Sequence, residues 1–188
     1  MGLLDSWADL IYRTTTRGPR YRAVVTPIGL TFWFGIAALL VFASLWLDGA
    51  AHLPHFVSPP ASIALGVPLL LLWAALCGWT AARFFIARGS PVPLNSPQEL
   101  VTTGLYGSVR NPMVAGWLVG MVGLGIVLGS ISYTFIAAPL FALLNVLYLK
   151  GVEERELERK FGQEYLRYKE QVPMFIPRFR RRRHGAGG

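Results

Sequence analysis

Four long stretches without a charged side chain constrain this chain more than any other feature of its sequence. Each is 17 to 22 residues long and contains no Asp, Glu, Lys or Arg. A membrane-spanning helix needs roughly 20 consecutive apolar residues, so each stretch is long enough, with the third at the short limit. The sequence therefore predicts four spanning helices, over residues 27–47, 61–85, 112–128 and 131–149, of which the second extends three residues beyond its uncharged stretch, 61–82.

The composition favours a membrane protein over a soluble domain. Only 15% of the 188 residues are charged and the mean hydropathy is +0.44, whereas soluble domains carry about 25% charged residues. We expect one all-α integral membrane domain over residues 1–188, built from two helical hairpins. The single cysteine, Cys77, lies in the second apolar run, so neither a disulfide nor a cysteine-based metal site is expected.

The positions of the basic residues predict the topology. All 18 Lys and Arg residues precede the first run, lie between the second and third, or follow the fourth. Because short cytoplasmic loops are enriched in Lys and Arg, both termini and the central loop are predicted to be cytoplasmic. Basic proteins often bind nucleic acid, but these charges line one membrane face, where anionic headgroups attract them. We expect the bilayer and not nucleic acid as the partner.

Three segments outside the apolar runs are predicted to lie at the cytoplasmic face. Residues 1–22 begin with an apolar helical face over 2–12, which predicts an interfacial helix rather than a cleavable signal. Residues 151–177 carry apolar residues at helical spacing, which predicts an amphipathic helix that ends at Pro173. Residues 178–188 form a basic tail, either bound to headgroups or disordered.

The third and fourth apolar runs are separated by only two residues, Gly129 and Ser130, which predicts a tight antiparallel hairpin. Such a hairpin brings the start of the third run beside the end of the fourth. Acidic residues close to a membrane are costly unless they are paired or solvated. The glutamates at this level are therefore candidates either for ligand binding or for ion pairs. The polar residues that would meet are Arg110, Asn111, Lys150, Glu153 and Glu154.

Two further features surround this meeting point. Residues 88–111 contain three prolines and three glycines, which predicts an ordered loop rather than a helix. The third run carries glycines at Gly116, Gly120 and Gly123, and small residues at this spacing allow helices to approach closely. Close packing is the main interpretation of these glycines, and access for a flat ligand is the other.

Three motifs in this part of the chain resemble a known family. They are LVTTGLYGSVRNPMVAG, EERELERKFGQEYLRY and VPMFIP. Their sequence and spacing resemble the isoprenylcysteine carboxyl methyltransferase family, with its bacterial members and the related phospholipid methyltransferases. The resemblance covers residues 88–178, nearly half of the chain, and the first two apolar runs show no comparable signature.

The resemblance implies an integral membrane methyltransferase that binds S-adenosylmethionine at the cytoplasmic face and methylates a lipophilic or amphipathic acceptor. The implied cofactor contacts are Gln98, Leu100, Val101, Tyr106, Asn111, Pro112, Met113, Val114, Glu153 and Glu154. Arg110, Glu153 and Lys150 are the implied catalytic residues. Arg110 or Lys150 would hold a carboxylate acceptor, whereas a glutamate would take the proton of an amine or a thiol.

Two positions depart from the family pattern. Asn111 stands where many relatives have His, and Asn cannot titrate near neutral pH. Val114 stands where Tyr is usual, which removes a hydroxyl and a ring from the wall of the site. These departures concern the acceptor, whose identity the sequence leaves open together with the oligomeric state.

Two other functions are compatible with the same residues. One is a membrane reductase of the sterol-reductase type, which would bind NADPH. The other is a non-catalytic membrane scaffold in which Arg110 and Glu153 pair with each other. Binding of S-adenosylhomocysteine or of NADPH distinguishes the three.

Overall fold

The structure is a computed structural model that describes residues 19–86 and 99–177. All regular secondary structure in these two ranges is helical, which confirms the all-α prediction for this part of the chain. The predicted interfacial helix at 2–12, the basic tail at 178–188 and most of the first half of the 88–111 loop lie outside the described residues.

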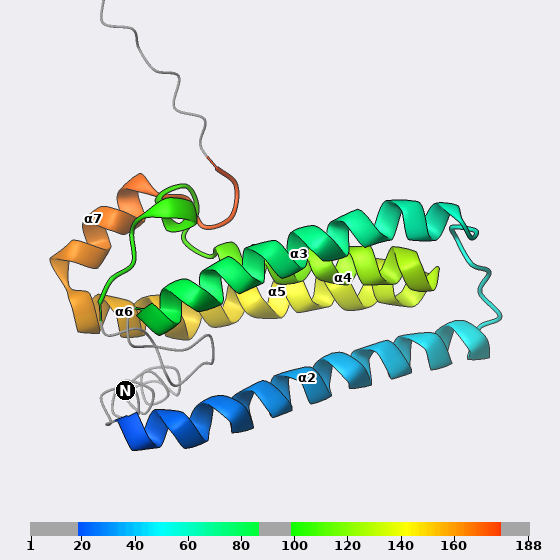
Figure 1. Ribbon diagram of the computed structural model, residues 1–188, viewed down its shortest axis with the longest axis horizontal. Coiled ribbons are helices and arrows are strands. Elements are labelled where there is room, and N and C mark those ends of the chain that lie inside the picture. The colour runs from blue at the N-terminus through cyan, green and yellow to red at the C-terminus, as the bar shows by residue number, and fades with distance from the viewer. Residues whose placement is uncertain (1–18, 87–98, 178–188) are drawn as a thin grey trace, which may run out of the picture.

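Three long apolar helices and one shorter helix form the body of the protein (Figure 1). Residues Pro27–Ala50 of α2 (Pro19–Ala50), Ala61–Phe84 of α3 (Ala61–Ile86) and Tyr133–Phe161 are long and apolar enough to cross a membrane. The helix α4 (Pro112–Leu128) is equally apolar but has 17 residues. Many large apolar side chains on these helices are exposed, as expected of surfaces that face lipid.

The glycines of α4 allow it to pack closely along α3. A Cβ atom at Gly120 would lie 2.6 Å from Cγ of Trp73, and one at Gly123 would lie 2.8 Å from Cβ of Leu69. Carbon atoms that are not bonded to each other do not approach so closely. The expected close packing is therefore confirmed, and the partner of Gly116, Gly120 and Gly123 is α3.

The hairpin between α4 and the next helix turns at Gly129, whose φ of 63° lies in the left-handed region that suits glycine. The end of α2 is fastened to this turn by Asp48. Its carboxylate accepts hydrogen bonds from the Ser130 hydroxyl and, at 3.0 Å, from the backbone N–H of Ser132. The C-terminal end of α2 and the turn of the hairpin are thus held together.

The fourth apolar run belongs to a continuous helical segment with two π-helical turns. It comprises a π-turn at Tyr133–Ala137, α5 (Ala138–Tyr148), a second π-turn at Leu149–Glu153 and α6 (Glu154–Phe161). In Figure 1, α5 lies beside α4, which packs along α3, whereas α2 is drawn apart from these three helices. The buried cluster of Met121, Tyr133, Ala137 and Ala138 packs against Leu40 and Val41 of α2.

The segment 151–177 forms two helices rather than the single helix predicted. Gly162 has a φ of 55° and a ψ of −128°, which ends α6, and α7 (Gln163–Gln171) leaves in a new direction. A residue with a Cβ rarely adopts such a conformation. The apolar stripe is nevertheless buried as one cluster, in which Tyr165, Tyr168 and Val172 pack against Leu100, Leu157 and Phe161.

Candidate active site

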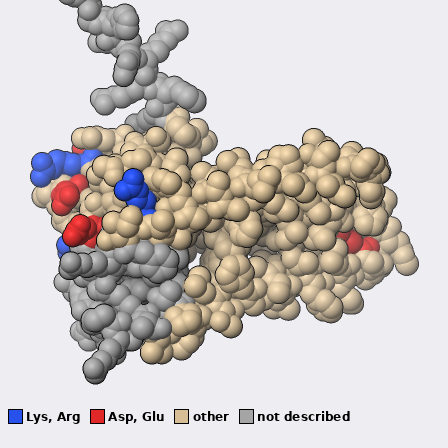
Figure 2. All heavy atoms as spheres, viewed as in Figure 1, with Lys and Arg blue, Asp and Glu red and all other residues tan. Residues whose placement is uncertain are grey.

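A cavity of about 760 Å³ lies between α2, α3, α4 and α5 and reaches the loop before α4. One end is lined by polar residues of that loop and of the helices after α5, and the rest is lined mainly by apolar and aromatic side chains. Figure 2 shows charged side chains gathered at the end of the molecule formed by α6 and α7, with almost none over the long helices. The cavity therefore joins a charged surface to an apolar interior.

Most of the residues singled out from the sequence line this one cavity. They are Leu100, Val101, Tyr106, Arg110, Asn111, Met113, Val114 and Glu153. The structure brings them together from the loop, the start of α4 and the end of the fourth apolar run, as the predicted hairpin requires.

Four of the residues predicted from the sequence are not among those that line the cavity. Pro112 is buried as the first residue of α4, and Glu154 is buried beside the cavity without lining it. Lys150 is exposed and is absent from the cavity wall, so the structure offers no support for its contact with a ligand. Gln98 lies outside the described residues.

The loop before α4 is held in place by the segment that follows α7. The backbone N–H of Arg110 donates to the Pro173 carbonyl at 2.8 Å, and the N–H of Asn111 donates to the Met174 carbonyl at 3.1 Å. The Tyr168 hydroxyl donates to the Tyr106 carbonyl at 2.7 Å. The VPMFIP motif thus positions the loop, which explains why these two distant motifs belong to the same site.

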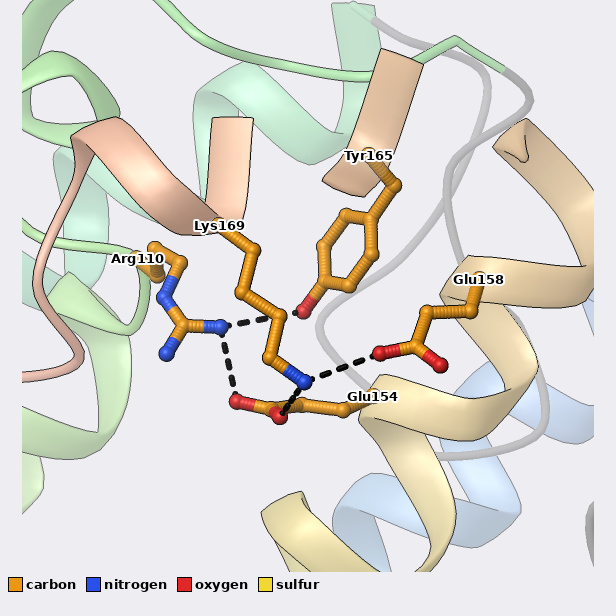
Figure 3. Close-up of polar contacts among 5 residues, drawn as sticks. All are labelled: Arg110, Glu154, Glu158, Tyr165 and Lys169. Carbon is orange, nitrogen blue, oxygen red and sulfur yellow. Dashed lines mark hydrogen bonds and ion pairs between the residues drawn. The ribbon is translucent and has the colours of Figure 1, made fainter. Parts of the chain in front are cut away.

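A buried ion-pair network lies directly behind the cavity wall (Figure 3). Arg110 Nη1 lies 2.7 Å from Glu154 Oε1, and Lys169 Nζ lies 2.6 Å from Glu154 Oε2. Lys169 also contacts Glu158 at 2.8 Å, and Arg110 Nη1 lies 3.4 Å from the Tyr165 hydroxyl. The side chains of Arg110 and Glu154 are only 11% and 10% exposed.

The two adjacent glutamates have separate environments because neighbouring residues of a helix point about 100° apart. Glu154 binds the two cations, whereas Glu153 lines the cavity and forms no ion pair with any residue that the structure describes. The partner of Arg110 is therefore Glu154, not Glu153 as the scaffold hypothesis assumed. Sequence reasoning missed Lys169, because its approach to Glu154 depends on the break at Gly162.

Three buried tyrosines surround the network and the loop. Burial raises the pKa of Tyr106, Tyr165 and Tyr168 above the ordinary value of 10.0. Their phenol groups therefore remain neutral at neutral pH. The Tyr168 hydroxyl donates to the Tyr106 carbonyl, and the Tyr165 hydroxyl accepts from Arg110 Nη1. They provide an apolar but hydrogen-bonding wall rather than a charged one.

The start of α4 adds an anion-binding element to the same end of the cavity. Pro112 occupies the first helical position, as the sequence predicted, and the Asn111 side chain forms no capping hydrogen bond. The backbone N–H groups of the first turn are therefore free to bind a negative group. Arg110 also contributes a buried Nε atom without a hydrogen-bond partner in the described part of the chain.

These features suit a ligand with three kinds of group. Leu100, Val101 and Tyr106 provide apolar walls for a flat ring, and Glu153 can bind hydroxyl or ammonium groups. The first turn of α4 suits a carboxylate. S-Adenosylmethionine has an adenine, a ribose, an ammonium and a carboxylate group, so the side chains present fit this cofactor.

Comparison with known proteins places this arrangement in a family. The model of the phospholipid methyltransferase family matches residues 62–164, more than half of the chain. Methanethiol S-methyltransferase 2 of Bradyrhizobium diazoefficiens is 31% identical over 175 residues, which is 87% of this chain and 55% of that protein. The cobalt-zinc-cadmium resistance protein CzcN of Cupriavidus metallidurans is 35% identical over 158 residues, 84% of this chain and 62% of that protein.

A eukaryotic relative matches a shorter stretch of the chain. The protein-S-isoprenylcysteine O-methyltransferase of Schizosaccharomyces pombe is 33% identical over 86 residues, 44% of this chain and 35% of that protein. The chain thus spans less than two thirds of the length of each of these three relatives. The family match, the shared motifs and the helical membrane architecture agree: the chain belongs to the phospholipid methyltransferase family, which includes the isoprenylcysteine methyltransferases.

Proposed function

We propose that the protein is an S-adenosylmethionine-dependent methyltransferase with four membrane spans and a site at the cytoplasmic face. The observation that supports this proposal most is that Glu153, Asn111 and Met113 all line the polar end of one cavity. The fourth span is α4, whose 17 residues lie at the lower limit of the range for a crossing helix. The distribution of Lys and Arg supports the cytoplasmic orientation.

Each part of the polar end has a role in this proposal. Glu153 binds the ribose hydroxyls or the ammonium group of the cofactor, and the first turn of α4 binds its carboxylate. Leu100 and Val101 contact the adenine. Arg110 holds the loop through Glu154 and lines the polar end of the cavity. The cofactor supplies the methyl group as a sulfonium substituent.

Methyl transfer needs chiefly alignment of the acceptor and exclusion of water. The apolar part of the cavity provides both, since Trp33, Trp117 and Phe141 line it from three different helices. The acceptor is a lipophilic or amphipathic molecule that occupies this part. The names of the relatives cover both a thiol and a prenylated carboxylate as acceptors, so family membership leaves the acceptor class open.

Titration calorimetry of the purified full chain tests the cofactor assignment. S-Adenosylhomocysteine should bind, and NADPH should not. The phosphate groups of NADPH need basic side chains, but Arg110 is the one Lys or Arg residue in the described cavity wall, and it is already paired with Glu154. The substitution Glu153→Gln should weaken binding of S-adenosylhomocysteine about tenfold or more, because it removes a charged hydrogen-bond acceptor. Glu164→Gln, an exposed glutamate on α7, is the matched control and should leave the affinity unchanged.

Tight binding of NADPH instead of S-adenosylhomocysteine would favour a reductase. Binding of neither ligand would favour a scaffold. Equal affinities of Glu153→Gln and the unsubstituted protein would refute the assignment of Glu153.

A further inference from the structure

Asn145 is the one amide side chain in the fourth apolar run and lies four residues before its end. It lies on α5 and lines the cavity together with Phe141 and Tyr148 of the same helix. Polar side chains in membrane-spanning helices cost free energy, and they usually face a cavity or another helix, where they have a function. Neither packing nor the proposed cofactor contacts explain this amide.

The hydrogen bonds of Asn145 fix the orientation of its amide. Its Nδ2 group donates to the backbone carbonyl of Phe141 at 2.8 Å. A carbonyl can only accept, so the nitrogen must face the helix and the oxygen must be the other amide atom. Within the part of the chain that the structure describes, Oδ1 has no partner, and it remains available to accept a hydrogen bond in the cavity.

The Asn145 amide lies in the apolar part of the cavity, away from the polar end. Asn145 precedes Glu153 by eight residues, which corresponds to about 12 Å along a helix. The side chains around this level are aromatic: the ring centres of Trp33 and Phe141 are 5.9 Å apart, and those of Trp33 and Trp117 are 6.3 Å apart. Among the described residues that line the cavity, the only Lys or Arg is Arg110, which lies at the polar end and is paired.

We propose that Asn145 binds the methyl acceptor by accepting a hydrogen bond from an uncharged S–H, O–H or N–H group. The acceptor is accordingly a neutral nucleophile that carries a hydrogen, and not a carboxylate. This inference rests on the proposed methyltransferase function and specifies its substrate class. A carboxylate only accepts hydrogen bonds. Oδ1 would repel it, and its only amide donor would be the second N–H of Nδ2, whose first N–H is bonded to Phe141. Since no unpaired Lys or Arg is among the described residues of the cavity wall, a carboxylate at this level would be buried at a high desolvation cost.

The reaction of such an acceptor balances without a further reagent. The lone pair of the acceptor atom forms the new bond to the methyl carbon. The bond between that carbon and the sulfonium sulfur breaks, and its electron pair stays on the sulfur. The acceptor then loses its proton to water at the polar end of the cavity. Asn145 positions the nucleophile and takes no part in proton transfer.

Ligand binding to the full chain saturated with S-adenosylhomocysteine tests the inference. The matched probes are 1-butanethiol and butanoate, and tryptophan fluorescence reports binding because Trp33 and Trp117 line the cavity. We expect saturable binding of butanethiol that is at least about tenfold tighter than that of butanoate. Asn145→Leu, which keeps a similar volume and removes the amide, should weaken butanethiol binding by about tenfold.

Two controls separate recognition from folding. Leu147→Ala changes an exposed residue of the same helix and should leave butanethiol binding unchanged. Asn145→Leu should bind S-adenosylhomocysteine with unaltered affinity, since it removes a polar group from an apolar segment and lies far from the polar end. A merely structural role for Asn145 would change both affinities.

The possible outcomes are distinct. Butanoate binding as tightly as butanethiol, unchanged butanethiol binding in Asn145→Leu, or no saturable binding of either probe would each overturn the inference while leaving the cofactor assignment intact. If S-adenosylhomocysteine itself does not bind to the unsubstituted chain, the proposed function fails and the inference fails with it.

Discussion

Removal of the Glu154 carboxylate is the sharpest test of how the site is held together. Glu154 contacts Arg110 at 2.7 Å and Lys169 at 2.6 Å, and it joins the loop before α4 to α7. Glu154→Gln leaves the Arg110 guanidinium, whose side chain is 11% exposed, without its carboxylate partner. Breaking a buried pair in this way typically costs about 3–5 kcal/mol.

The position of Lys169 provides the matched comparison. Its side chain is 35% exposed, and Lys169→Met leaves Glu154 paired with Arg110. Glu158, the other partner of Lys169, is equally exposed and can turn to water. Because half-exposed pairs contribute little, we expect Lys169→Met to cost about 1 kcal/mol or less.

Unfolding of the purified chain in detergent, followed by circular dichroism, measures both values. Amide hydrogen exchange should show that the loss in Glu154→Gln is concentrated in α7 and in the loop at 104–111, which the network connects. The double variant Arg110→Met with Glu154→Leu should recover much of the stability, since it removes both buried charges. Equal stabilities of Glu154→Gln and Lys169→Met, or a double variant less stable than Glu154→Gln, would refute this reasoning.

Two other properties follow from the packing and the buried tyrosines. Gly120→Ala should destabilise the chain by about 1–3 kcal/mol, because the added methyl meets Trp73. Gly35→Ala on α2 is the control and should not destabilise it, since the new methyl has open space around it. Equal unfolding midpoints of the two variants would contradict the close packing of α3 and α4. Burial raises the pKa of Tyr106 and Tyr168 above 10.0, so the stability that their neutral forms contribute is complete below pH 10 and is lost as the pH rises through the folded-state values. The phenolate absorbance of these two tyrosines should therefore appear together with loss of helix in an alkaline titration, and their ionisation in a fully helical chain would contradict it.

The boundaries of the helices could be largely predicted from the sequence because a bilayer imposes a length on any uncharged run. The run 112–128 coincides with α4, and all but the first two residues of the run 131–149 lie within the helical segment Tyr133–Phe161. Because only Gly129 and Ser130 connect the third and fourth runs, the helices on either side of them must be antiparallel. The meeting of Arg110 with the glutamates after the fourth run followed from that geometry, and the structure confirms it.

The exact pairing at the site could not be predicted, because it depends on the directions of side chains rather than on their order. Glu153 and Glu154 are adjacent and chemically identical in the sequence, and only the helix rotation at the π-turn Leu149–Glu153 assigns one to the cavity and the other to Arg110. Lys169 reaches Glu154 because the helix predicted over this segment is broken at Gly162, where α6 ends and α7 begins in a new direction.

The sequence alone therefore determined the class of fold, the hairpin and the region of the site, since hydrophobic length and loop length act locally along the chain. The tertiary structure alone decided which carboxylate lines the cavity and which is paired with Arg110, and it placed the amide of Asn145 on the cavity wall. These outcomes depend on how helices rotate and pack against one another, which requires contacts between residues that are distant in the sequence.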